Sequence, residues 1–149
     1  QQAQSKKEHG GDKSRLAEMT YICKQTIHTQ KKAKREYWAM MGDFNAVSRL
    51  DKVIYDYADN SPAYWVHDYI LEETPYKDVI KECYPDTVIS TTGKTKRIDF
   101  VYATPKLLKK VKHAAIIREG YPAPVRNAQN ISNFWHPSDH SPILVDFRF

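Results

Sequence analysis

The chain contains 149 residues, of which 41% are hydrophobic and 12% aromatic, and its 23 Lys and Arg against 18 Asp and Glu give a formal net charge of +5. A chain of this length buries the core of one domain without disulfides or structural metals. No apolar run within the chain approaches the ~20 residues that a membrane helix requires, and no basic leader followed by an apolar stretch marks a signal peptide. We therefore expect a soluble domain.

The N-terminal third predicts a flexible leader followed by one helix. Residues 1–11 are polar and end in two glycines, which is typical of a loop. Asp12 can cap a helix by accepting a hydrogen bond from the first turn. Apolar residues then recur at helical spacing as far as about Gln30, at Leu16, Met19, Cys23 and Ile27.

The rest of the chain predicts mixed α and β structure. Tyr37–Met41 is an apolar run typical of a buried strand, and it ends at a polar Gly-Asp-Phe-Asn turn. Two helices are expected, one starting at Ser61 with Pro62 in its first turn and one over Tyr76–Cys83. Strands are expected over Thr87–Thr92, Ile98–Ala103, Val111–Arg118 and Ile143–Phe149, with a long loop over Gly120–Pro137. The order lacks regular βαβ alternation and a glycine-rich phosphate loop.

The two cysteines, Cys23 and Cys83, are too few for a disulfide framework or a four-cysteine zinc site. They fit two buried thiols, and a single bridge between them stays open. The basic residues gather in three runs, at Lys31–Arg35, Lys94–Arg97 and Lys106–Lys112. These runs favour an anionic partner, nucleic acid first and a phospholipid surface second, whereas solvated helix ends and turns are the structural alternative.

Three polar clusters carry candidate chemistry. In the first, Asp43 and Asn45 follow the strand at Tyr37–Met41, and an extended backbone would direct both side chains to the same side. A carboxylate there can take a proton from water, and an amide can donate to a developing oxyanion. The alternative is a purely structural turn in which the Asp side chain bonds the backbone.

The second and third clusters are Lys96 to Tyr102 and His136 to Pro142. Asp99 lies inside an apolar strand, so burying it requires a partner, for which Arg97 or the backbone is one candidate. If the partner is instead His140, the carboxylate fixes one imidazole tautomer, the arrangement of general acid–base pairs. Asp139 would then face the other way and could bind a hard cation.

Taken in this order, Gly-Asp-Phe-Asn, Arg-Ile-Asp-Phe and Ser-Asp-His before a final strand resemble the endonuclease/exonuclease/phosphatase superfamily, which includes DNase I, exonuclease III and the apurinic/apyrimidinic endonucleases. The resemblance implies a two-sheet α/β sandwich of the DNase I-like type. It covers residues 12–149 as the C-terminal half of the family's domain.

The resemblance also assigns roles to five residues. Asp43 matches the carboxylate that orients or deprotonates the attacking water, and Asn45 matches the amide that assists it and stabilises the transition state. His140 matches the histidine that contacts the scissile phosphate, and Asp99 matches the carboxylate that supports this histidine. Asp139 matches a residue of the metal site, and the metal would be Mg²⁺ or Mn²⁺.

Two features of the family pattern are missing upstream of Gly42, namely a strand ending in Asn and a strand ending in a metal-binding Glu. We therefore expect the chain to be a fragment that needs the missing N-terminal half of its domain and is inactive alone. A partial sheet should also expose a strand edge or apolar surface.

For the substrate, the sequence favours nucleic acid over other phosphodiesters. Lys94, Lys96 and Arg97 precede the strand of Asp99 and could contact phosphates, and Trp135 could stack on a base. The expected function is a metal-dependent phosphoesterase, specifically an endo- or exonuclease. The alternatives are a phosphatase acting on lipid or small phosphorylated substrates and a non-catalytic nucleic-acid-binding module.

Overall fold

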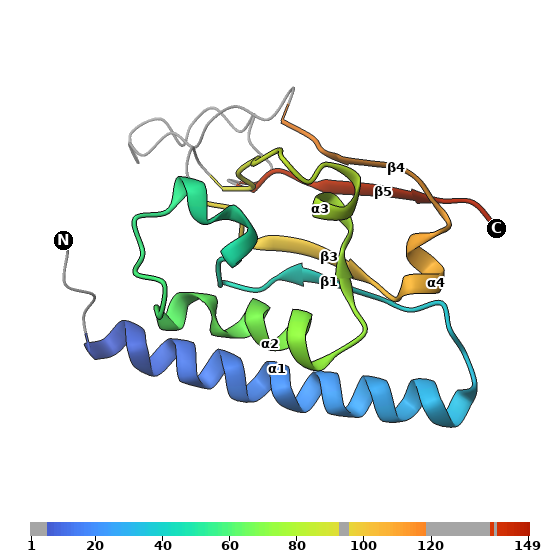
Figure 1. Ribbon diagram of the computed structural model, residues 1–149, viewed down its shortest axis with the longest axis horizontal. Coiled ribbons are helices and arrows are strands. Elements are labelled where there is room, and N and C mark those ends of the chain that lie inside the picture. The colour runs from blue at the N-terminus through green and yellow to red at the C-terminus, as the bar shows by residue number, and fades with distance from the viewer. Residues whose placement is uncertain (1–5, 93–95, 119–137, 139) are drawn as a thin grey trace.

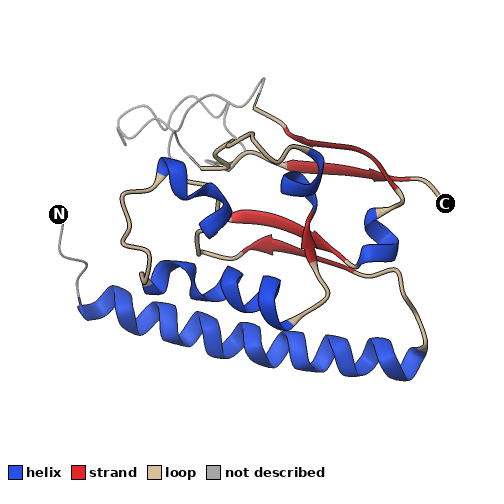
Figure 2. Ribbon diagram, in the orientation of Figure 1, coloured by secondary structure: helices blue, strands red, loops and turns tan. Residues whose placement is uncertain are grey.

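The structure is a computed structural model that describes residues 6–92, 96–118, 138 and 140–149, with side chains from residue 11 onward. Figure 2 shows its helices and strands. The helices are α1 (Lys6–Ala33), α2 (Trp65–Glu73), α3 (Val79–Cys83) and α4 (Pro105–Leu108), with 3-10 turns η1 (Arg49–Ile54) and η2 (Pro62–Tyr64). The strands are β1 (Ala39–Asp43), β2 (Lys77–Asp78), β3 (Asp99–Ala103), β4 (Val111–Ile116) and β5 (Ile143–Phe147). None of the described helices combines the length and the apolarity needed to cross a bilayer.

The elements form three layers, with α1 and α2 below, the sheet β1-β3-β2 in the middle and the two-stranded sheet β4-β5 above (Figure 1). All pairings are antiparallel. Alternation along β3 divides the core, because Phe100 and Tyr102 belong to the cluster on the helix side and Val101 and Ala103 to the cluster on the β4-β5 side. Asp99 has the same parity as Val101, so its side chain lies on the face toward the second sheet.

Helix α1 starts earlier than predicted. The apolar stripe is confirmed, since Cys23 is buried in the helix-side core and Met19 packs against it. However, the helix begins at Lys6, so residues 6–11 are not part of a loop, and Asp12 does not cap the helix but accepts a bond from Arg15 Nη2 at 2.7 Å. The lysines and glutamate of the first turn favour a helix, and each glycine opposes it by only about 1 kcal/mol.

The strands match the predicted ones except in three places, one of which is the two-residue β2, where a helix was expected. β3, β4 and β5 are confirmed. β1 is displaced toward the turn and is an edge strand rather than a buried one, with Met41 66% exposed. No strand forms at Thr87–Thr92, because the Thr91 hydroxyl accepts from the N–H groups of Ile98 and Asp99, leaving only isolated bridges at Thr92.

The short helices are partly as predicted. η2 and α2 follow Ser61, whose hydroxyl caps the turn, with Pro62 in its first position. The helix expected over Tyr76–Cys83 shortens to α3, because Asp78 closes β2 and caps the helix by accepting from two N–H groups. η1 was not predicted. Both cysteines are free, and Cys83 is exposed rather than buried.

A buried ion-pair network links η1, β2 and the start of β3. The Arg97 side chain is fully buried, its Nε donates to Asp51 at 2.7 Å, and its Nη2 donates to Asp78 at 2.6 Å. Although burial opposes the charged form, the hydrogen bonds and negative charges of Asp78 and Asp51 raise the pKa of the Arg97 guanidinium above its usual value. Arg97 is therefore a structural residue, and its prediction as a substrate-binding residue is wrong.

Replacing Arg97 should cost stability, because Arg97→Ala leaves the buried Asp78 without its ion-pair partner and leaves the buried Asp51 with Lys81 alone. We expect the free energy of unfolding, measured in urea, to fall by about 3–5 kcal/mol. The control Arg148→Ala removes an exposed guanidinium and should change it by less than about 0.5 kcal/mol. An Arg97→Ala protein as stable as the control would contradict the structural role.

Candidate active site

Two carboxylates and an imidazole meet where β1 and β3 meet the start of β5. The strand register pairs Asp43 directly with Asp99, so both side chains lie on the same face of the sheet. His140 reaches this face through its bridge to Thr92. Its Nδ1 lies 2.9 Å and 3.1 Å from the two carboxylate oxygens of Asp99.

The Asp99 contact fixes the chemistry of His140. Asp99 is half-buried, and an ionised carboxylate only accepts hydrogen bonds, so Nδ1 must carry the proton and donate. Nε2 is then the nitrogen that faces away from Asp99. This is the pairing expected from the sequence, and the alternative partner Arg97 is engaged elsewhere.

The three side chains line an open trough of about 380 Å³, here called the catalytic trough, whose wall includes Met41, Gly42, Val101 and Ile143. Asp43 is exposed, and it faces Asp99 across the strand pair. Like charges directly opposite each other destabilise a sheet, so this arrangement favours a cation in the trough.

The donor set fits such a cation. Asp43, Asp99 and His140 each offer one ligand atom, and these atoms lie within 4.8 Å of one another. Carboxylate oxygens suit Mg²⁺ and Mn²⁺. The two Asp side chains are therefore the residues that would hold the ion, while the Nδ1 of His140 is bound to Asp99. Asp139, the predicted metal residue, lies outside the described residues.

The turn after β1 is not extended, so the condition under which Asp43 and Asn45 would point to the same side is not met. Gly42 has φ 151° and Asn45 has φ 48°, backbone conformations that Gly and Asn adopt more readily than other residues. Asp43 accepts from the Asn45 N–H at 2.8 Å and from its side-chain Nδ2 at 3.2 Å. The structural alternative, a turn closed by the Asp side chain, is thus present, and it also fixes the amide of Asn45 against the carboxylate of Asp43.

A buried histidine holds this turn from the helix side. His67 of α2 lies between the Ala46 carbonyl, 3.1 Å from Nε2, and the Tyr102 hydroxyl, 2.6 Å from Nδ1. The carbonyl can only accept, so Nε2 donates to it and Nδ1 accepts from the hydroxyl. His67 thereby ties β3 to the residue that follows Asn45.

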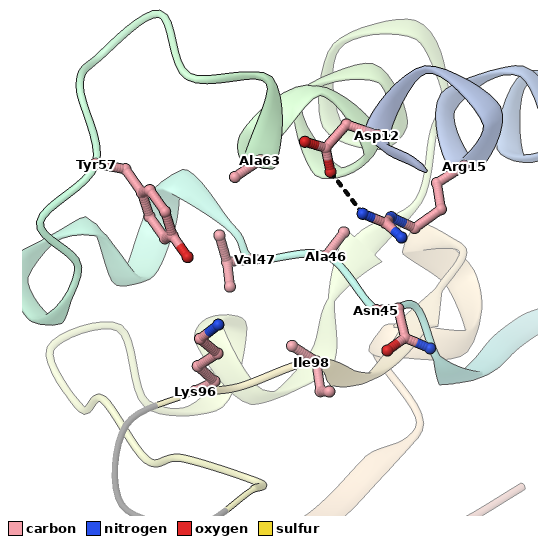
Figure 3. A pocket seen from close by; sticks show the side chains of 9 residues that line it. All are labelled: Asp12, Arg15, Asn45, Ala46, Val47, Tyr57, Ala63, Lys96 and Ile98. Carbon is pink, nitrogen blue, oxygen red and sulfur yellow. Dashed lines mark hydrogen bonds and ion pairs between the residues drawn. The ribbon is translucent and has the colours of Figure 1, made fainter. Parts of the chain in front are cut away.

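The predicted substrate-binding residues have different outcomes. Lys96 is exposed and lines a second cavity beside Asn45 (Figure 3). Arg97 is buried in the ion-pair network and does not reach a substrate. Lys94 and Trp135 lie outside the described residues.

Sequence reasoning missed two residues around the site. His67 is fully buried at a helical position without any motif, so only its packing reveals its role. Arg15 lines the cavity beside Asn45 and is paired with Asp12. Arg15 lies three residues after Asp12 on a helix, and residues at this spacing share one face, so the sequence could have indicated the Asp12–Arg15 ion pair.

No protein-family model matches the chain, and no curated protein matches it. Solved structures do match. The 3'-5' exonuclease NExo from Neisseria meningitidis gives a TM-score of 0.68 at 17% identity, over 97% of this chain and 56% of its own. The 3' phosphatase NExo from Neisseria, bound to a product DNA hairpin, gives a TM-score of 0.67 at 15% identity, over 97% of this chain and 56% of its own. An AP endonuclease from Archaeoglobus fulgidus gives a TM-score of 0.58 at 19% identity, over 91% of this chain and 55% of its own.

The chain thus has the α/β fold of these DNase I-like nucleases, which confirms the predicted fold class. It spans just over half the length of each solved structure that it matches.

His67 should make stability depend on pH. Burial lowers the pKa of His67 from 6.5 to about 3, so between these values the unfolded chain binds more protons and stability falls as the pH falls. We expect the free energy of unfolding to decline more steeply between about pH 6 and pH 4 than in His67→Gln, by about 1 kcal/mol per pH unit. Replacing the exposed His28 by Gln should keep the wild-type slope. Equal slopes in all three proteins would contradict a buried neutral His67.

The trough should bind a divalent cation through its carboxylates. We expect Mn²⁺ to broaden the amide signals of Asp43, Asp99 and His140 in NMR spectra, and Asp43→Asn to weaken this binding by about tenfold or more, because one anionic ligand is lost. Asp146→Asn removes an exposed carboxylate on β5 and should leave the binding unchanged. Uniform broadening over the surface, unaffected by Asp43→Asn, would contradict the site.

Proposed function

We propose that the chain carries part of the active site of a metal-dependent phosphodiesterase that acts on nucleic acid, as an endo- or exonuclease. The observation that carries the proposal is the contact of His140 Nδ1 with Asp99 at 2.9 Å, directly beside Asp43 in an open trough. A histidine held by a carboxylate, next to a second carboxylate and a cation-binding donor set, is suited to hydrolysing a phosphate ester.

In the proposed reaction, Asp43 orients a water molecule and takes its proton as the water oxygen bonds to phosphorus. The bond from phosphorus to the leaving oxygen breaks, and that oxygen leaves with the bonding electrons and gains a proton from solvent. When the His140 ring is protonated on both nitrogens, Nδ1–H stays bonded to Asp99 and Nε2–H donates to a phosphate oxygen, and the Asn45 amide stabilises the charge that develops there. A bound Mg²⁺ or Mn²⁺ would neutralise phosphate charge, and we propose that Asp139 contributes to its site.

Nucleic acid is the proposed substrate on two grounds. The solved structures with this fold include a 3'-5' exonuclease, an AP endonuclease and a 3' phosphatase bound to a product DNA hairpin. In this chain, Lys96 places an exposed cation beside Asn45. We further propose that Lys94 contacts phosphates and that Trp135 stacks on a base, as their sequence positions suggest.

We propose that the complete site needs strands outside this chain. The trough holds one compact set of three metal-ligating side chains within the described residues, and β1 presents an exposed edge with Met41 facing solvent. A neighbouring strand along β1 would cover that edge and could bring the further carboxylate that the family resemblance leads us to expect.

The test is hydrolysis by the full-length protein with Mg²⁺ of DNA, RNA, a phosphoinositide and sphingomyelin. We expect cleavage of a nucleic acid, loss of activity with chelator, and a fall in kcat of about 100-fold or more in Asp43→Ala and in His140→Ala. The chain offers a matched control, because His113 and Asp146 form a second, exposed His–Asp pair at 3.8 Å on β4 and β5. His113→Ala should keep wild-type activity.

Chelator-resistant cleavage, or unchanged activity in both site variants, would contradict the proposed function. Cleavage of only the lipid substrates would replace it by the lipid phosphatase alternative. Salt-sensitive nucleic-acid binding without turnover would favour the non-catalytic module.

A further inference from the structure

A second cavity lies beside the Asp43–Asn45 turn, between α1, the residues after the turn and the segment that leads into β3. Its volume is about 190 Å³. Figure 3 shows Arg15 and Asn45 at one end and Lys96 and Tyr57 at the other, with Val47 between them. Asn45 therefore belongs to this cavity and, through its hydrogen bonds to Asp43, is tied to the catalytic trough.

The cavity carries an excess of positive charge. Among the described residues that line it, Arg15 and Lys96 are the cations, and Asp12, which accepts from Arg15 Nη2, is the carboxylate. In the part of the chain that the structure describes, no carboxylate forms an ion pair with Lys96. The lining therefore attracts an anion.

Arg15 also presents an unused donor. Its Nε is buried and has no hydrogen-bond partner among the described residues, although Nη2 is paired with Asp12. A buried N–H without an acceptor is unfavourable, and such groups are normally satisfied by protein or water. An anionic oxygen in the cavity would satisfy it.

The size of the cavity restricts what binds there. Sites for whole drug-sized ligands measure roughly 300–1,000 Å³, so about 190 Å³ fits one small group of a larger molecule. A phosphate group offers several acceptor oxygens for separate donors, as Arg15 and Lys96 would require.

We propose that this cavity binds a second phosphate group of the polynucleotide strand whose scissile phosphodiester lies in the catalytic trough. The inference rests on the proposed function and adds Arg15 and Lys96 as the residues that hold the neighbouring phosphate. Lys96 was expected to contact phosphate from its sequence position, whereas Arg15 enters only because α1 packs beside the turn.

The test is an NMR titration of the full chain with a thymidine trinucleotide and, separately, with inorganic phosphate, following the Arg15 Nε–H signal. We expect the signal to move and saturate with the trinucleotide. Lys96→Gln should weaken that binding about tenfold, the value of one charge-assisted contact. Arg15→Lys retains a cation for Asp12 but lacks the Nε–H, and its trinucleotide affinity should fall similarly. Lys112→Gln, an exposed lysine on β4, should bind as the wild type does.

Salt dependence gives a second measurement. Losing one phosphate contact to a single strand should reduce the slope of log K against log salt by about 0.7 in Lys96→Gln but not in Lys112→Gln. Wild-type affinity and slope in both Lys96→Gln and Arg15→Lys would overturn the site. A signal that moves with inorganic phosphate but not with the trinucleotide would overturn the polynucleotide as its occupant.

The titration of the chain and the hydrolysis assay of the full-length protein together separate this inference from the proposed function. If the trinucleotide moves the Arg15 signal but the full-length protein hydrolyses no phosphodiester, the phosphate site stands and the proposed catalysis fails. If hydrolysis occurs and the Arg15 signal does not move, the catalysis stands and the site is overturned.

Discussion

The antiparallel pairing of β1 with β3 is the constraint on which the candidate site depends. Its register sets Asp43 opposite Asp99 on the face toward the second sheet, a repulsive pair that a purely structural sheet would avoid. His140 reaches the same point from the segment before β5 and donates to Asp99. A slip of one residue would move Asp43 to the helix face and separate these groups, so register and chemistry are fixed together.

The two basic residues just before β3, Lys96 and Arg97, point in opposite directions and have different roles. Arg97 points into the protein, where Asp51 and Asp78 neutralise it and join η1 to β2. Its neighbour Lys96 points outward into the cavity beside Asn45. On the helix side, His67 bonds both Tyr102 and the Ala46 carbonyl, so the strand of Asp99 and the turn of Asn45 are held by one buried side chain. The buried residues Arg97 and His67 thus stabilise the site, and the exposed Lys96 remains available to a ligand.

The sequence predicted the fold class and the Asp99–His140 contact, because both follow from short motifs at strand ends. It did not predict the start of α1. When packing is ignored, the two glycines outweigh the favourable residues of the first turn and indicate a loop, whereas the helix in fact continues through them. Arg97 was misassigned because its carboxylate partners lie 46 and 19 residues away, at positions that no local pattern connects. The same limit hid His67, whose hydrogen-bond partners Ala46 and Tyr102 lie 21 and 35 residues away, and it hid the cavity that α1 forms with the turn. Asp139, Lys94 and Trp135 stay predictions.

Asp99 holds His140 in one defined state beside Asp43, and the nitrogen NMR spectrum of the His140 imidazole can test this. We expect the neutral ring to carry its proton on Nδ1, bonded to Asp99, and Asp99→Ala to shift the balance toward protonated Nε2, the form usual for unconstrained histidine. A wild-type ring with its proton on Nε2, or a spectrum unchanged by Asp99→Ala, would contradict it.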